Sequence, residues 1–159
     1  MCAQQDTRAK LRDSPARMAD TNRHVTVDAS ARALVGTFPG NLGIELRQLD
    51  DERVSARMRV DARHLHPGGY VHGGAWVAFA DTVAAWGTMR HLPPERNFTT
   101  VELKCNVLAA GRAGDELIGE GELLHSGART QVWEVRVYRA VNGARERLMA
   151  NFVCTQMVL

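Results

Sequence analysis

Residues 68–89 read GGYVHGGAWVAFADTVAAWGTM, and this stretch decides the fold. Residues 75–89 are apolar on nearly every side, which is typical of a helix buried on all faces. The five alanines in this segment favour a helix and let other elements pack closely against it. We predict that the helix ends near Gly87, because the two prolines at 93–94 prevent its continuation.

On both sides of this helix the sequence favours β-strands joined by short turns. Between Val54 and Val60 apolar and polar residues alternate, as in a strand with one buried face. The expected strands cover residues 42–49, 54–60, 98–108, 115–125, 130–140 and 147–157. The connectors of the last four are too short for crossovers, so we expect antiparallel neighbours. The pattern predicts an α+β domain in which an antiparallel sheet of about six strands wraps around one long central helix.

The segment before the first expected strand differs in character. Residues 1–30 are polar and lack a periodic apolar pattern, so we expect a flexible N-terminal extension. Apolar residues at positions 31, 34, 35 and 38 have helical spacing, which predicts a short helix over residues 30–38 that stops at Pro39. The folded domain is expected to span residues 31–159.

The composition fits one soluble domain and excludes several function classes. The 159 residues are 45% hydrophobic and 24% charged, and the net charge of +2 comes from interleaved signs, which argues against nucleic-acid binding. No apolar run approaches the roughly 20 residues of a membrane span. The three cysteines form no CxxC pair, which argues against a zinc site and for a reducing compartment. We therefore expect a cytoplasmic protein with neither a nucleic-acid nor a membrane partner.

Asp81 lies in the middle of the apolar helix and needs an explanation. Burying an unpaired carboxylate costs several kcal/mol, so the side chain must be paired, protonated or exposed to a water-filled cleft. Apolar surroundings make a carboxylate a stronger base, which is useful in catalysis. Two interpretations remain open: a catalytic base or nucleophile, and a structural carboxylate that bonds to a neighbouring backbone group or to Thr82.

The glycine-rich segment 68–74 stands directly before this helix. Free N–H groups at a helix start attract negative charge and can stabilise the oxyanion formed when a thioester carbonyl is attacked. An ordinary turn is the alternative, and a phosphate site lacks the GxxxxGK[ST] pattern. Gly73 and Asp81 are eight residues apart, or about 12 Å along one helix. Since both groups would have to contact one carbonyl, we predict a homodimer in which Gly73 of one copy meets Asp81 of the other.

Residues 66–82, HPGGYVHGGAWVAFADT, resemble the HGG…D signature of the PaaI-like and 4-hydroxybenzoyl-CoA thioesterase families. The resemblance covers about residues 34–159, with further likeness at 41–45, 99–108, 111–114 and 125–130. It implies a hotdog fold, a double-hotdog dimer and usually a dimer of dimers. It also implies hydrolysis of a small or medium acyl-CoA, aromatic acyl groups included, without a metal or other cofactor.

Carried over to this chain, the resemblance makes Gly73 the oxyanion donor and Asp81 of the facing subunit the nucleophile or general base. His66 stands where the family commonly has Asn or Gln, and we expect it to position water or the thioester. Ala85 stands where some relatives carry a hydroxyl residue. The residues expected near the substrate are His72, Gly74, Thr82, Arg129 and Thr130, although Arg129 and Thr130 also fit a solvated strand end.

Three alternative interpretations depend on the histidines of this loop. The HxH spacing of His64 and His66, with His72 nearby, invites a zinc site, but we expect none and interpret His72 as a support of the turn. Hydration or dehydration of an acyl thioester would pair His66 or His72 with Asp81. An acyl-CoA-binding module with weak catalysis would follow from the change at His66.

Overall fold

The computed structural model describes residues 27–159 except Glu52 and Pro94, so residues 1–26 of the predicted extension lie outside the described residues. Residues 27–30 of that extension already belong to the first helix. In chain order the helices and strands are α1 (Val27–Ala33), α2 (Phe38–Asn41), β1 (Ile44–Leu49), β2 (Arg53–Arg59), the 3₁₀ turn η2 (Ala62–His64), α3 (Gly73–His91), β3 (Phe98–Val107), β4 (Glu116–Ser126), β5 (Thr130–Val141) and β6 (Ala144–Val158).

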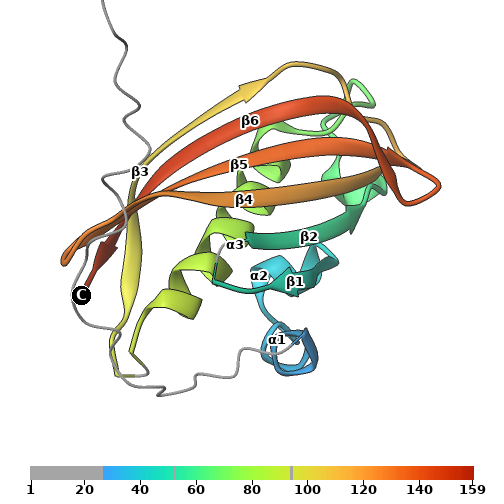
Figure 1. Cartoon of the computed structure of the whole chain (residues 1–159). Helices are drawn as coiled ribbons and strands as arrows, with labels where there is room; N and C mark the ends of the chain where they lie inside the picture. The colour runs from blue at the N-terminus through green and yellow to red at the C-terminus, as the bar shows by residue number, and fades with distance from the viewer. Residues whose placement is uncertain (1–26, 52, 94) are drawn as a thin grey trace, which may run out of the picture.

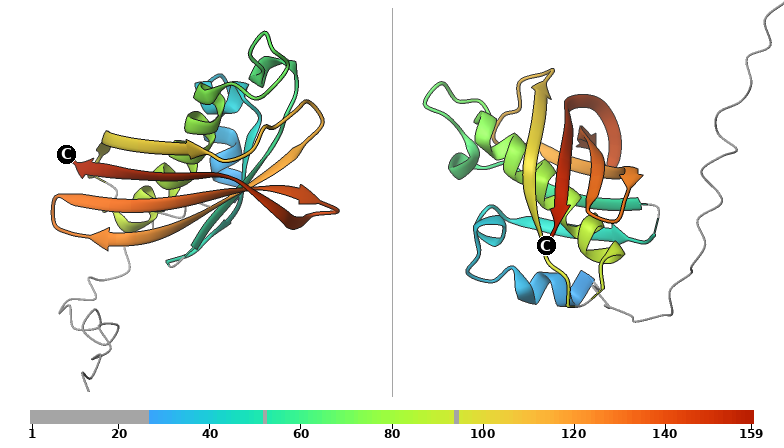
Figure 2. Two further views of the ribbon diagram at one scale, coloured as in Figure 1. Left: turned by 90° about the horizontal axis from the view of Figure 1, so that it is seen from above. Right: turned by 90° about the vertical axis from the view of Figure 1, so that its left-hand side faces the viewer.

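The six strands form one antiparallel sheet in the order β1-β2-β4-β5-β6-β3. The sheet curves around α3, which runs along its inner face (Figure 1). The views in Figure 2 show that α1 and α2 lie beside β1, at the end of the sheet opposite β3. The predicted α+β fold, with a sheet wrapped around one long helix, is confirmed.

The core lies between α3 and the sheet. Trp76, Phe79 and Val83 of α3 are fully buried against it. Gly87 faces the ring of Trp133 so closely that a Cβ there would stand 2.4 Å from the ring. The prediction that the helix ends near Gly87 is therefore wrong, because this glycine permits close packing and the helix continues to His91.

The helix predicted over residues 30–38 is also wrong in its bounds. The structure has two short helices there, separated by a turn in which Gly36 has φ +75°. Pro39 lies in the first turn of α2, where the missing N–H has no intrahelical partner to lose. The proline therefore begins a helix here and does not stop one.

The two edge strands are covered to different extents. Ile44 and Leu46 of β1 are 3% exposed. Leu103 and Val107 of β3 pair with buried residues of β6, Cys154 and Ala150, and so point to the same inner face. They are nevertheless 41% and 48% exposed, so the core side of β3 is incompletely covered by this chain.

No helix among the described residues is both long enough and apolar enough to cross a membrane.

Candidate active site

The start of α3 offers a free backbone donor. His72 is the N-cap residue, and its Nδ1 accepts a hydrogen bond of 2.9 Å from the N–H of Gly74. In the part of the chain that the structure describes, the N–H of Gly73 has no hydrogen-bond partner, and Gly73 is exposed. An unpaired N–H at the positive end of a 19-residue helix is suited to an anionic oxygen.

The turn before α3 holds His66 in one orientation. The N–H of His66 donates to the carbonyl of Tyr70 at 2.9 Å, and the N–H of Gly69 donates to the carbonyl of His66 at 2.9 Å. The N–H of Gly68 donates to Nδ1 of His66 at 2.9 Å. Because Nδ1 is the acceptor, the neutral ring carries its hydrogen on Nε2. The half-buried ring therefore presents Nε2–H as a donor.

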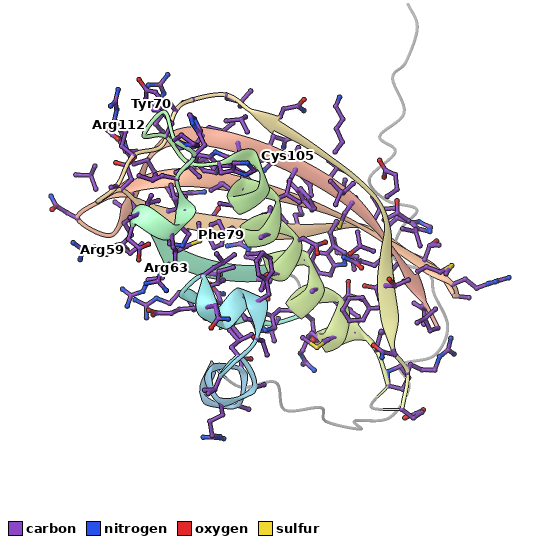
Figure 3. All side chains as sticks on the ribbon, turned by 180° about the vertical axis from the view of Figure 1, so that it is seen from behind. Arg59, Arg63, Tyr70, Phe79, Cys105 and Arg112 are labelled. Carbon is purple, nitrogen blue, oxygen red and sulfur yellow. The ribbon has the colours of Figure 1, made fainter. Side chains whose placement is uncertain are left out.

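The sequence reasoning missed a second support of this turn. Figure 3 shows Tyr70 and Arg112 side by side, and the guanidinium carbon of Arg112 lies 4.5 Å from the centre of the Tyr70 ring. An N–H of Arg112 also donates to the Tyr70 hydroxyl at 3.1 Å. The Tyr70 ring in turn lies 5.9 Å from the ring of His66. No sequence pattern indicates this contact, because it joins positions 42 residues apart.

The Asp81 carboxylate lies two helical turns beyond Gly73 and is half-buried. Its Oδ1 accepts a hydrogen bond of 2.9 Å from the hydroxyl of Thr100 on β3. The hydroxyl of Thr82 donates to the carbonyl of Ala78 at 2.7 Å, within the helix. The interpretation that pairs Asp81 with Thr82 is therefore wrong.

Two residues of β6 continue the polar contacts of Asp81. Oε1 of the fully buried Gln156 lies 3.0 Å from the Thr100 hydroxyl, and its Nε2 lies 3.5 Å from the sulfur of Cys154. Burial and the nearby charge of Asp81 raise the pKa of Cys154 to about 12, so the thiol stays protonated at neutral pH. The carboxylate thus stands at one end of a row of polar side chains.

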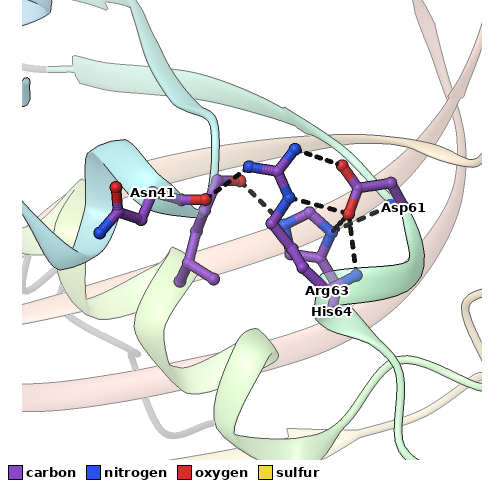
Figure 4. A network of polar contacts seen from close by, with 5 residues as sticks. Asn41, Asp61, Arg63 and His64 are labelled. Carbon is purple, nitrogen blue, oxygen red and sulfur yellow. Dashed lines mark hydrogen bonds and ion pairs between the residues drawn. The ribbon is translucent and has the colours of Figure 1, made fainter. Parts of the chain in front are cut away.

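The three histidines of the loop are used separately. Figure 4 shows His64 in a network with Asp61 and Arg63. The buried His64 ring accepts from the N–H of Asp61 at 2.9 Å through Nδ1, while its Nε2 lies 2.8 Å from the carbonyl of Leu42. Arg63 binds the Asn41 carbonyl at 2.6 Å. His64 is therefore structural, and the described residues contain no group of three or more His, Cys, Asp or Glu side chains that could hold a metal ion.

The predicted site residues fall into three places on the chain. His66, His72, Gly73 and Gly74 gather at the start of α3, and Asp81 and Thr82 lie further along it. Arg129 and Thr130 lie at the β4–β5 turn, at the level where β3 begins. The start of α3 is instead tied to the segment after β3, through the N–H of Val71 and the carbonyl of Gly111. One chain therefore does not bring the three places together.

Two hollows on the single chain lie elsewhere. One of about 510 Å³ is lined by charged residues of the outer sheet face, among them Arg53, Glu120 and Arg136. A second is lined by Arg59, Glu116 and neighbours of the β3–β4 and β5–β6 connections. Neither includes Gly73 or Asp81.

Comparison with known proteins gives matches over most of the chain. A sequence model of the thioesterase superfamily matches residues 68–144. The proofreading thioesterase EntH of Cronobacter turicensis is 33% identical over 116 residues, which are 73% of this chain and 84% of that protein. The 1,4-dihydroxy-2-naphthoyl-CoA hydrolase of Escherichia coli is 29% identical over 73% of this chain and 85% of its own length. A variant of the thioesterase PA1618 of Pseudomonas aeruginosa has a similar fold, with a TM-score of 0.79, 23% identity, and coverage of 86% of this chain and 96% of its own.

Proposed function

This chain belongs to the thioesterase superfamily and has its hotdog fold, and we propose that it hydrolyses an acyl-CoA thioester to a free acid and CoA. The observation that carries the proposal is the unpaired Gly73 N–H at the start of the helix that also bears the half-buried Asp81 carboxylate. The Escherichia coli relative is named a hydrolase of an acyl-CoA, which supports an acyl-CoA as the substrate here. The proposed substrates include acyl-CoAs with an aromatic acyl group.

The Gly73 N–H would bind the thioester carbonyl oxygen, where negative charge develops during attack. Asp81 can act in one of two ways. Its oxygen can attack the carbonyl carbon, so that the C–S bond breaks, CoA leaves as a thiolate that takes up a proton, and water hydrolyses the resulting anhydride. Alternatively, it can accept a proton from a water molecule whose oxygen attacks, and that proton then goes to the departing sulfur. Both routes give the acid and CoA.

We propose that residues from two copies of the chain form each active site. Gly73 and Asp81 are about 12 Å apart along α3, too far to act on one carbonyl. The exposed inner face of β3 is an argument for a partner chain at this edge. Leu103 and Val107 face the same side of the sheet as the core residues, yet this chain leaves them exposed. A partner related by a two-fold axis would place its Asp81 beside Gly73 of this chain. We extend this proposal to a dimer of dimers.

The remaining predicted residues receive different roles in the proposal. His66 would donate from Nε2–H to the attacking water or the thioester, as an amide side chain would. His72 would shape the helix start, and because Gly74 donates to it, only Gly73 is left to bind the oxyanion. Arg129 and Thr130 of an adjacent subunit would contact the CoA part of the substrate. Neither a metal nor another cofactor is required, and the free thiols of Cys105 and Cys154 support a reducing cytoplasm.

The geometry favours hydrolysis over hydration or dehydration. A hydratase of this design would need a histidine nitrogen free to accept a proton next to Asp81. His66 and His72 each use Nδ1 to accept a backbone hydrogen bond, which leaves an N–H on the other nitrogen. An acyl-CoA-binding module without catalysis would bind the substrate but release no thiol.

The decisive experiment measures thiol release from a panel of aliphatic and aromatic acyl-CoAs. We expect turnover by the native chain and a loss of about 100-fold or more in kcat for Asp81→Asn. Asp51→Asn, an exposed carboxylate at the β1–β2 turn, is the matched control and should retain the native rate. A native rate in folded Asp81→Asn would refute the site, and binding without thiol release by the native chain would refute the activity.

A further inference from the structure

Asp81 is connected to residues of two strands by a row of short polar contacts. The Thr100 hydroxyl on β3 lies 2.9 Å from Oδ1 of Asp81 and 3.0 Å from the amide of Gln156 on β6. That amide lies 3.5 Å from the sulfur of Cys154. Gln156 and Cys154 are fully buried, and Thr100 and Asp81 are half-buried. The row therefore leads from the core to the carboxylate.

With Asp81 as a carboxylate, one arrangement of the hydrogens satisfies every contact. The Thr100 hydroxyl has one hydrogen, so it cannot donate to both Asp81 and a Gln156 oxygen. The oxygen and nitrogen of a glutamine amide are assigned from the surrounding hydrogen bonds. The structure places Oε1 of Gln156 toward Thr100. Exchanging the amide oxygen and nitrogen turns the nitrogen toward Thr100, so that Gln156 donates to the hydroxyl oxygen and the hydroxyl donates to Asp81. The amide oxygen then accepts from the Cys154 thiol, which remains protonated because burial raises its pKa to about 12.

A β-bulge aims Thr100 at the carboxylate. Thr100 pairs with Gln156 and Glu102 pairs with Thr155, so Val101 is the extra residue of β3 at this point. Such bulges turn a side chain out of the regular alternation of a strand. Leaving the buried amide of Gln156 without hydrogen-bond partners would cost free energy of folding. The contact with Gln156 therefore fixes the Thr100 hydroxyl in addition to the backbone of β3.

We propose that Thr100 and Gln156 are positioning residues that hold Oδ1 of Asp81 and direct its Oδ2 at the reacting group. The inference rests on the proposed function and assigns the two residues to the same site. Oδ2 has no hydrogen-bond or ion-pair partner among the described residues, while Oδ1 accepts the hydrogen bond from Thr100. A carboxylate fixed through one oxygen keeps the other oriented for attack or for accepting a proton from water. Thr100 and Gln156 act only through Asp81 and do not touch the substrate.

The test compares Thr100→Val, which keeps the shape but removes the hydroxyl, with Thr100→Ser, which keeps the hydroxyl. With an acyl-CoA that the native chain hydrolyses, Thr100→Val should lower kcat by about tenfold to 100-fold, since a hydrogen bond to a charged group is lost. KM should stay within about twofold. Thr100→Ser should restore kcat to near the native value, and Thr99→Val, an exposed neighbour on β3, should have no effect.

A second comparison separates positioning from a general structural role. In an Asp81→Asn background, Thr100→Val should leave the residual rate unchanged, because the group it positions is already altered. An equal loss in both backgrounds, a native kcat for Thr100→Val, or no recovery with Ser would each overturn the inference. The native chain and Asp81→Asn are measured first. If the native chain is inactive or Asp81→Asn is fully active, the proposed function fails, and this outcome is distinct from a failure of Thr100 alone.

Discussion

The two edges of the sheet differ in how this chain covers them. At β1, the core-facing Ile44 and Leu46 are almost fully buried, with α1 and α2 beside the strand (Figure 2). At β3, Leu103 and Val107 face the same side of the sheet but remain about half exposed. The chain therefore completes its core at one edge only.

This difference relates the fold to the chemistry. Asp81 accepts a hydrogen bond from Thr100, a residue of the open edge, and among the described residues it makes no hydrogen bond to β1. An exposed edge with apolar residues is a template for pairing with another chain. A second copy at β3 would therefore cover the apolar residues and complete the site in one step.

The largest effect is expected when a charge is placed on the inner face of β3. Leu103→Lys should give a monomer, because an ammonium group cannot be buried without a partner, and thiol release should fall by about 100-fold. Analytical ultracentrifugation and the thiol assay measure the two effects. Val35→Lys, a matched change at an exposed apolar residue near the covered edge, should leave both unchanged. A fully active Leu103→Lys dimer would contradict the role of this edge.

A smaller effect compares the same truncation at both edges. Leu46→Ala should lower the free energy of unfolding by about 2–4 kcal/mol, because it leaves a cavity beneath β1. Leu103→Ala should cost about 1 kcal/mol or less in protein dilute enough to be monomeric, because much of that side chain already contacts water. Urea unfolding at low protein concentration measures both values. Equal losses would show that the edges are equally covered.

The smallest effect concerns the polar network beside the covered edge. The Arg63 side chain holds the pKa of Asp61 below its ordinary value, so the folded state binds this proton less tightly than the unfolded chain does. The stabilisation is present above the unfolded pKa of about 3.9 and is lost as pH falls through the lowered value. Asp61→Asn should therefore flatten the fall of Tm below about pH 4, whereas Glu95→Gln at an exposed loop should not. An identical acid profile for the native chain and Asp61→Asn would contradict this.

The elements of the fold were predictable because their signals are local. The alternation that predicted a strand over residues 54–60 corresponds to β2, and the apolar run at 75–89 corresponds to most of α3. The end of α3 was missed because Gly87 fits against Trp133, a contact that belongs to the tertiary structure. The split into α1 and α2 was missed because Pro39 is compatible with both the end and the start of a helix.

The sequence indicates Gly73 and Asp81 as candidate site residues but does not indicate the contacts that surround them. Asp81 and Gly73 were identified from the helix that bears them. The contacts of Thr100 with Asp81 and Gln156 join positions 19 and 56 residues apart, and depend on β3 pairing outside β6. His64 likewise has the spacing of a metal ligand in sequence, whereas its ring is used to join the loop to Leu42. Pairings of this kind follow from strand order, which no local pattern records.

Gly87 of α3 packs so closely against the Trp133 ring that this position has no room for a Cβ. Because Gly73 and Asp81 both lie on this one helix, α3 fixes the distance and the angle between them. In the proposed dimer, an antiparallel copy would bring Gly73 of each chain beside Asp81 of the other at one register only. Inserting a single residue between Gly73 and Asp81 would rotate one of them by about 100° relative to the other, and in the proposed symmetric dimer both sites would lose activity together.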